Sequence, residues 1–116
     1  MAEYLPIYKP GQAITLAASA TITGGQLVEV TGSGTHAPAG AASVKVVGVA
    51  AFDAANGDNV TIFAGGVQSV LASGAVTAGA VVQAGASGTV ATGTTAPIGI
   101  ALTTGTDVAV RVQMAR

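Results

Sequence analysis

The sequence predicts an all-β fold, a small β-barrel or β-sandwich built from two similar halves, with an extended N-terminal arm and at most one short helical turn. Gly and other turn residues recur every several positions, and short runs rich in Val, Ile and Thr lie between them. No window of about 11 residues has the apolar spacing of a helix without a Gly inside it. The chain also resembles itself at an offset of 54 residues that shrinks along the sequence, which indicates two related halves.

Residues 1–11 are predicted to form the extended arm. Each Pro fixes its own backbone and biases the preceding residue toward an extended conformation, and a segment with missing N–H groups cannot pair as a central strand. Tyr is favoured at interfaces because it offers a large ring with a polar tip. We expect the arm either to contact another chain or to fold back over the end of its own barrel. The candidate contact residues are Tyr4, Leu5, Pro6, Ile7, Tyr8, Lys9 and Pro10.

Eight strands are expected after the arm. The last of them alternates most clearly, because Val108, Val110 and Val112 fall on one face, as the period of a half-buried strand requires. The predicted strands cover residues 13–17, 26–31, 44–50, 59–64, 67–72, 80–84, 98–102 and 108–113.

The segment F-D-A-A-N-G-D at residues 52–58 has two interpretations. Asp53 could cap one helical turn that ends before Gly57. Alternatively, Asn56 and Gly57 could form a tight hairpin turn.

An internal repeat is the most informative feature of the sequence. Residues 18–37 align with residues 72–91 at an offset of 54, and the Gly residues of the two segments agree in order, which favours duplication over chance similarity. The matched pairs include Ser19 with Ser73, Gly25 with Gly79, Val28 with Val82, Gly34 with Gly88 and Thr35 with Thr89.

The similarity continues with a shrinking offset. V-G-V-A at 47–50 matches I-G-I-A at 98–101, and G-D-N-V-T-I at 57–62 matches T-D-V-A-V-R at 106–111. The offset thus falls through 51 to 49, as deletions in loops would produce. We predict a single β domain over residues 12–116, with pseudo-repeats at about 18–66 and 72–113.

The composition limits the classes of function. A chain of 116 residues suits one domain with a modest core, and with 50% hydrophobic but only 3% aromatic residues, Val must carry much of that core. Because large core-filling side chains are scarce, association with further copies of the chain or with a partner would add stability. Charged residues make up 8%, against about 25% in an average domain, and the net charge is −1. Nucleic-acid binding is therefore not expected.

Targeting and redox signals are absent from the sequence. Its first 20 residues lack the basic start and apolar run of a signal peptide, and no stretch reaches the ~20 apolar residues of a membrane span. The lack of Cys excludes disulfides, thiolate metal sites and a Cys nucleophile. We expect a soluble protein made in a cytoplasm, without a membrane partner.

Catalytic chemistry is poorly represented. His36 is the only histidine and lies in a Gly-rich segment that we predict to be a loop, and only five carboxylates could support it. Asp53 and Asp58 flank a turn, where Asp routinely accepts backbone hydrogen bonds. T-G-S-G-T at 31–35 lacks the Gly-Lys-Ser/Thr ending of a phosphate loop and is predicted to be a hairpin turn. No enzyme, cofactor or metal site is predicted.

Phe63 is a further candidate contact residue. Val60 and Ile62 share one face of the predicted strand 59–64, which puts Phe63 on the other, exposed face. The flanking A-G-G could instead bend the strand and turn the ring inward.

The order of these elements resembles a known family. Three segments, at residues 4–35, 46–68 and 97–113, are similar to the capsid cement, or head decoration, proteins of tailed bacteriophages. They begin Y-L-P-I-Y-K-P-G-Q, V-V-G-V-A-A-F-D and P-I-G-I-A-L-T-T-G. The resemblance covers the chain from Tyr4 to Arg111.

The resemblance implies a β-rich protein without enzymatic activity that binds the outer surface of an assembled phage head. Such a protein clamps neighbouring major capsid subunits together, often as a homotrimer, and the family supplies no catalytic residues. The alternative is a receptor- or carbohydrate-binding module of a virion or cell surface, although the chain has only Tyr4, Tyr8, Phe52 and Phe63 for stacking on sugars.

Overall fold

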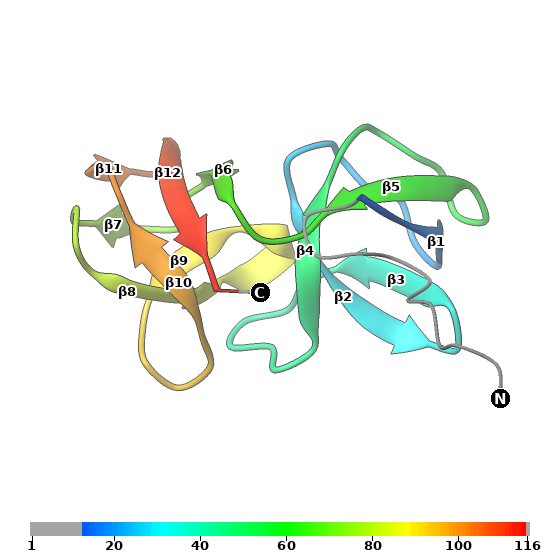
Figure 1. Cartoon of the computed structure of the whole chain (residues 1–116), viewed down its shortest axis with the longest axis horizontal. Coiled ribbons are helices and arrows are strands. Elements are labelled where there is room, and N and C mark those ends of the chain that lie inside the picture. Colours follow the sequence, from blue (N-terminus) through cyan, green and yellow to red (C-terminus); the bar gives the residue numbers. More distant parts are fainter. Residues whose placement is uncertain (1–12, 116) are drawn as a thin grey trace, which may run out of the picture.

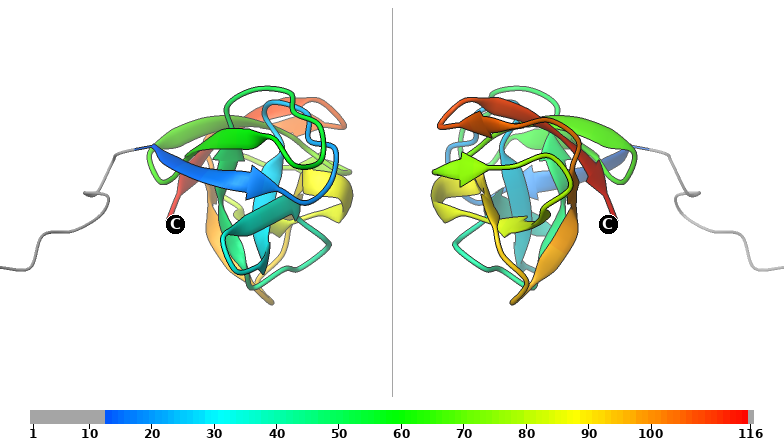
Figure 2. Two further views of the ribbon diagram at one scale, coloured as in Figure 1. Left: turned by 90° about the vertical axis from the view of Figure 1, so that its right-hand side faces the viewer. Right: turned by 90° about the vertical axis from the view of Figure 1, so that its left-hand side faces the viewer.

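The computed structural model describes residues 13–115, which form twelve strands and one short 3₁₀ turn. Two lobes lie side by side along the long axis (Figure 1), and in the views along that axis one lobe lies in front of the other (Figure 2). The prediction of an all-β fold with at most one short helical turn is confirmed. The predicted arm, residues 1–11, lies outside the described residues.

The first half, residues 13–64, forms a closed five-stranded barrel. Its strand order is β1-β3-β2-β4-β5, and β5 pairs back to β1. β1 and β3 run parallel, whereas the other neighbours run antiparallel. The strands are β1 (Ile14–Ala18), β2 (Leu27–Gly32), β3 (Thr35–Pro38), β4 (Val46–Ala50) and β5 (Asn59–Phe63).

The second half, residues 67–115, forms a five-stranded sheet of order β6-β12-β10-β8-β9 and a small two-stranded sheet of β7 and β11. A parallel bridge between Ala72 and Val90 joins the two edges of the larger sheet. The elements are β6 (Val67–Leu71), β7 (Ala75–Val76), β8 (Val81–Ala84), the 3₁₀ turn η1 (Ala86–Gly88), β9 (Val90–Thr92), β10 (Pro97–Ala101), β11 (Gly105–Thr106) and β12 (Ala109–Met114).

The two halves have the same strand order and the same register, so the prediction of two similar halves is confirmed. The pair Val28–Gly48 of the first half corresponds to Val82–Gly99 of the second, at offsets of 54 and 51. The parallel pair Ala18–His36 likewise corresponds to the Ala72–Val90 bridge.

The last predicted offset is wrong by one residue. Leu16 pairs with Val60 and Val70 with Val110, so β5 corresponds to β12 at an offset of 50, not 49. An offset of 49 would match buried Val60 with exposed Ala109, because a slip of one residue exchanges the two faces of a strand.

All eight predicted strands are present with shifted ends, but four others were missed. β3, β7, β9 and β11 have only two to four residues each, and neighbouring strands rather than local propensity fix them. The predicted buried face of the last strand also needs correction. Val108 precedes β12 and is 52% exposed, whereas Met114 completes the face with Val110 and Val112.

Residues 52–58 form no helix, so the helical interpretation is wrong. Asn56 and Gly57 do lie in a turn, but it is not a hairpin, because Ala54 before it pairs with Ile22 and Asn59 after it pairs with Ala17. Gly57 has a φ of 95°, and the Asp58 N–H donates to the Ala55 carbonyl over 3.1 Å. Asp53 is not a helix cap, because its Oδ1 accepts from the Gly24 N–H at 2.7 Å.

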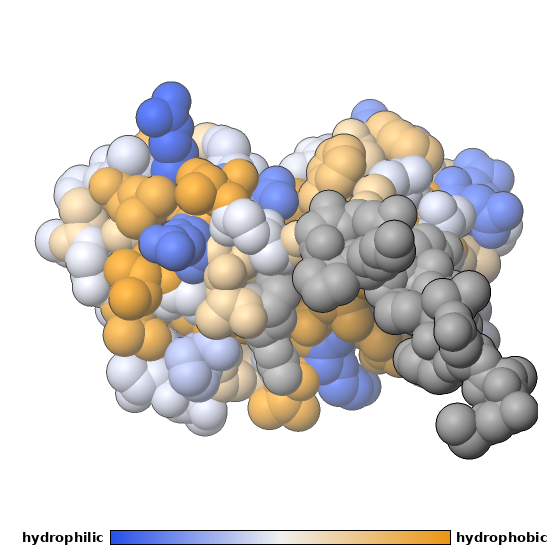
Figure 3. All heavy atoms as spheres, in the orientation of Figure 1, coloured by the Kyte–Doolittle hydropathy of each residue, from blue (hydrophilic) through white to orange (hydrophobic). Residues whose placement is uncertain are grey.

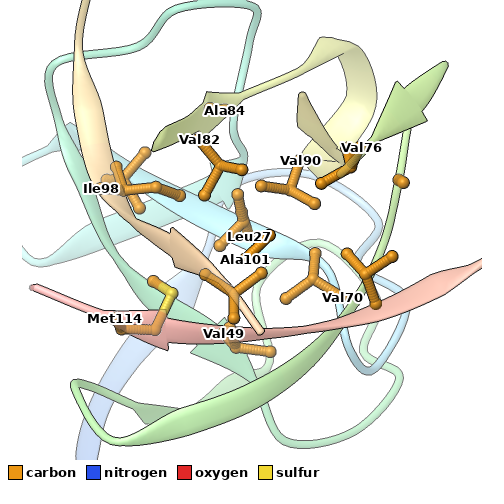
Figure 4. Packing of buried hydrophobic residues seen from close by; sticks show 14 of the residues in the cluster. Leu27, Val49, Val70, Val76, Val82, Ala84, Val90, Ile98, Ala101 and Met114 are labelled. Carbon is orange, nitrogen blue, oxygen red and sulfur yellow. The ribbon is translucent and has the colours of Figure 1, made fainter. Parts of the chain in front are cut away.

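One hydrophobic cluster is shared by both halves. Leu27, Val46 and Val49 lie on the outside of the first barrel and pack into the interior of the second half (Figure 4). A separate, smaller cluster fills the first barrel. The single domain over residues 12–116 stays a prediction, which the shared cluster favours.

Gly48 and Gly99 lie at the centres of β4 and β10, where the neighbouring strand approaches closely. A Cβ on Gly99 would overlap the Gln113 carbonyl oxygen and lie 3.1 Å from the Met114 Cα. A Cβ on Gly48 would overlap the Phe63 carbonyl oxygen. Since these neighbours are backbone atoms, they cannot move aside cheaply, and each half requires Gly at this position.

Gly99→Ala is expected to lower the free energy of unfolding by about 2–3 kcal/mol or more, because the added methyl group forces the β10 and β12 backbones apart. Urea denaturation measures this change. Gly40→Ala is the matched control, since its nearest atom would be the Glu29 Oε1 at 3.7 Å. Equal stability of the two variants would contradict the close approach.

His36 lies in β3 and not in a loop, so the sequence prediction for it is wrong. Its side chain is 0% exposed, and neither ring nitrogen has a hydrogen-bond partner. Val90 occupies the corresponding position in the second half. Burial lowers the pKa of His36, and the nearby Ala17 backbone opposes this only in part. His36 is therefore a neutral core residue.

His36→Val is expected to raise the free energy of unfolding at neutral pH by about 1–2 kcal/mol, because it removes unpaired buried polar atoms. The wild-type chain should also lose stability as the pH falls below about 6.5, the pKa of an unfolded His, since the unfolded state then binds the proton more readily. Thermal unfolding of both chains between pH 8 and 5 measures the difference. Parallel pH profiles would contradict the assignment.

Candidate functional site

The carboxylates of the described residues serve the fold. Asp107 Oδ1 accepts from the Gly74 N–H at 2.8 Å, and Asp58 Oδ2 accepts from the Ala55 N–H at 3.2 Å. Glu29 accepts from the Gly40 N–H at 2.8 Å. The prediction that Asp53 and Asp58 serve turns is confirmed by their backbone hydrogen bonds.

Within residues 13–115, no group of three His, Cys, Asp or Glu residues could hold a metal ion. No helix in this part of the chain is long and apolar enough to cross a membrane. The site that stands out in the described residues is therefore a surface.

The outer face of β6, β12 and the end of β10 carries large exposed apolar side chains around a cation. Arg111 of β12 lies beside Ser69 of β6, and on its other side the Leu102 N–H donates to the Arg111 carbonyl at 2.7 Å. Hydrophobic residues surround hydrophilic ones over β10 and β12 in the space-filling view (Figure 3). We call this surface the β12 face; it consists of Val67, Ser69, Leu71, Leu102, Ala109, Arg111 and Gln113.

The apolar side chains of the β12 face are not required by the repeated fold. Val67, Leu71 and Leu102 are 56%, 52% and 45% exposed. Their counterparts in the first half, at residues 13, 17 and 51, are all Ala. The two halves share a backbone, so this difference is confined to the surface. A comparison of the two halves of the sequence at the correct offsets would have revealed it.

A groove of about 340 Å³ borders the β12 face at the junction of the two halves. Ser69 and Leu71 line one side, and Thr23, Gly24 and Gln26 of the first half line the other. Gln26 Nε2 spans the junction and donates to the Ser87 carbonyl at 3.0 Å. None of the residues that line the groove is ionisable, so the groove offers contact area but no acid–base chemistry.

Phe63 is exposed, as one of the two sequence interpretations expected. Its side chain is 45% exposed at the end of β5, while Val60 and Ile62 point into the barrel. The inward orientation is therefore wrong. A contact of Phe63 with another protein stays a prediction, and the other candidates, Tyr4 to Pro10, lie outside the described residues.

The fold is similar to a solved phage structure, "The crystal structure of head fiber gp8.5 N base in bacteriophage phi29". The TM-score is 0.74 at 18% sequence identity, over 90% of this chain and 93% of that chain. At this identity, the likeness shows the fold alone. Comparison with curated proteins found no significant match.

The sequence itself matches the model of one protein family, described as phage cement protein, over residues 8–115. This match spans most of the chain and all of the described strands. The chain therefore belongs to the phage cement protein family and is a structural protein of the phage capsid.

Proposed function

We propose that this protein decorates the outer surface of an assembled phage head and stabilises the head by bridging neighbouring major capsid subunits. The observation that carries the proposal is the β12 face, where Val67, Leu71 and Leu102 are about half exposed although the fold does not require them. Membership of the cement family supports a capsid partner. The carboxylates that hold turns support a structural rather than a catalytic role.

The chemistry of the β12 face suits a shell made of protein. Burial of apolar surface contributes roughly 25 cal/mol per Å², and Arg111 can pair with a carboxylate or a carbonyl group within the contact. With a net charge of −1, the chain depends little on long-range attraction, so salt should weaken the contact only slightly.

A homotrimer fits this role. Copies that each touch the shell multiply modest affinities, because the first contact raises the effective concentration of the others. Within each copy, the arm residues Tyr4 to Pro10 and Phe63 are proposed to add to the contact with the shell. A receptor- or carbohydrate-binding role has less support, since Phe52 and Phe63 are the only aromatic residues in the described part of the chain.

Purified protein added to expanded shells that lack it should bind saturably and make the shells more resistant to heat and chelators. Co-sedimentation measures the binding, and light scattering during heating measures the resistance. Binding to glycans without binding to shells would favour the alternative role and contradict the proposal.

The double variant Val67→Ser/Leu102→Ser is expected to bind shells tenfold or more weakly, which corresponds to about 1.4 kcal/mol or more. Both side chains are exposed, so folding should be preserved, and a thermal melt checks this. Val44→Ser, at a residue that is 69% exposed in the first half, is the matched control. Equal affinity of the two variants would remove the β12 face from the contact.

A chain that begins at Gln12 is expected to bind shells more weakly than the full chain, because it lacks the apolar area of the arm. The same co-sedimentation assay measures the difference, with Phe63→Ser tested alongside. Unchanged binding of the shortened chain would indicate that the arm covers its own barrel.

A further inference from the structure

The contact between the two halves joins two different surfaces, a sheet face of the first half and a barrel end of the second half. Because the halves are similar, each of these surfaces occurs a second time in the chain, where it takes no part in the contact. In the contact that is made, the outer face of the first barrel covers one end of the second half. Leu27 and Val49 are 0% and 4% exposed there, and the Gly88 N–H donates to the Ala39 carbonyl at 2.8 Å. The same sheet face exists in the second half, and the same barrel end exists in the first.

The unused sheet face lies on β8 and β10. At the register of the repeat, Leu27 corresponds to Val81, Val46 to Pro97 and Val49 to Ile100. Val81 is 37% exposed and Ile100 47% exposed, and Pro97 is also exposed. These positions remain apolar although no part of the described chain covers them as it covers their counterparts. We call Val81, Pro97 and Ile100 the free face; Ile100 also borders the β12 face beside Gln113.

The unused barrel end lies on β1, β2 and β4. Fully buried Val70 and Ile98 of the second half correspond to Leu16 and Val47, which are only partly buried. Buried Ala84 corresponds to Val30, which is 37% exposed. The first barrel is therefore less completely covered than the second half at the same end. We call Leu16, Val30, Val47 and the neighbouring Gly34 the open end.

Gly34 and Gly88 give the most direct comparison of the two ends. Their φ angles are 74° and 75°, so the turns that they occupy have the same conformation at these residues. A Cβ on Gly88 would lie 2.7 Å from the Gln26 Cβ and 3.0 Å from the Leu27 carbonyl, whereas a Cβ on Gly34 would meet no atom within 4 Å. The turn at Gly34 thus has the same local conformation as the turn at Gly88, but no residues lie against it as Gln26 and Leu27 lie against Gly88.

We infer that copies of this chain associate head to tail, with the free face of one copy packed against the open end of the next. The contact repeats the one between the two halves, so its geometry is already present in the molecule. A contact between unlike surfaces leaves one of each surface exposed until a ring closes. The inference depends on the fold and not on capsid binding.

The contact between copies should be weaker than the contact within the chain. Ala80 replaces Gln26, so the hydrogen bond from the Gln26 side chain to Ser87 has no counterpart. The loop after β9 is three residues shorter than the loop after β3, and it cannot repeat the hydrogen bond from the Ala42 N–H to the Ala84 carbonyl. We therefore expect association that depends on concentration.

Two variants test the inference through the mass of the protein in solution. Ile100→Asp should disable the free face and Val30→Asp the open end, and each variant alone should be monomeric where the wild-type chain forms a ring. An equal mixture of the two should form dimers and nothing larger, since only one intact contact remains per pair. Val108→Asp, at another exposed residue of the second half, is the control and should keep the ring. Thermal melts check that all three variants fold.

Cross-linking gives a second measurement that does not require a variant that breaks the contact between copies. Ser33 and Ala80 correspond to Ser87 and Gln26, which touch across the internal contact, and the chain has no native Cys. Oxidation of a mixture of Ser33→Cys and Ala80→Cys chains should give a disulfide dimer that contains one chain of each kind. The mixture of Ser69→Cys and Ala80→Cys chains is the control.

A monomeric wild-type chain at every concentration tested would overturn the inference, as would a ring that survives both Asp substitutions. A chain that begins at Gln12 should still associate. If it becomes monomeric while Ile100→Asp has no effect, the arm and not the free face joins the copies, and the inference is wrong. Because these measurements use no shells, their outcome is separate from that of the shell-binding assay.

Discussion

Burial of the first barrel's outer face against the end of the second half is the interaction on which the rest of the structure depends. Leu27 and Val49 belong to a strand pair whose other side lines the first barrel, so two β-strands contribute to both cores at once. This double use compensates for the scarcity of large side chains, because an outward face that would otherwise be wetted becomes interior. A chain with 3% aromatic residues thereby builds two adjacent cores mainly from Val, Ile and Ala.

The same contact explains why equivalent positions have different chemistry. Positions that line both barrels are mostly apolar in both halves, and the polar exceptions include His36 in place of Val90 and the partly buried Gln68 in place of Ile14. Positions on the outer face of β6 and β12 are free to differ, and there the second half has Leu and Val where the first has Ala. The two halves share one backbone, and the outer face of the second half is the surface proposed for binding.

Much of the fold could be predicted from the sequence, because strong signals repeat. The eight longer strands follow from Val-rich alternation, and the two halves follow from ordered Gly matches. The short strands could not be predicted, since β7 and β11 depend on their partners and not on their two residues. The offset of the last strand failed because Asp58 and Asp107 look equivalent, whereas Asp107, with a φ of 53°, occupies the place of Gly57. For the site, the outward orientation of Phe63 was one of two that the sequence predicted. The β12 face could not be predicted, because the sequence does not show that β6, β12 and β10 are neighbours.

The difference between the halves also bears on symmetry. If the proposed homotrimer is joined by the head-to-tail contact, six similar units would alternate around the ring, and the groove within each chain would carry Leu71 and Ser69. The groove between chains would carry the corresponding residues of the first half, Ala17 and Thr15. The large side chain of Leu71 would then recur three times around the ring and not six. Such a ring would present three equivalent β12 faces.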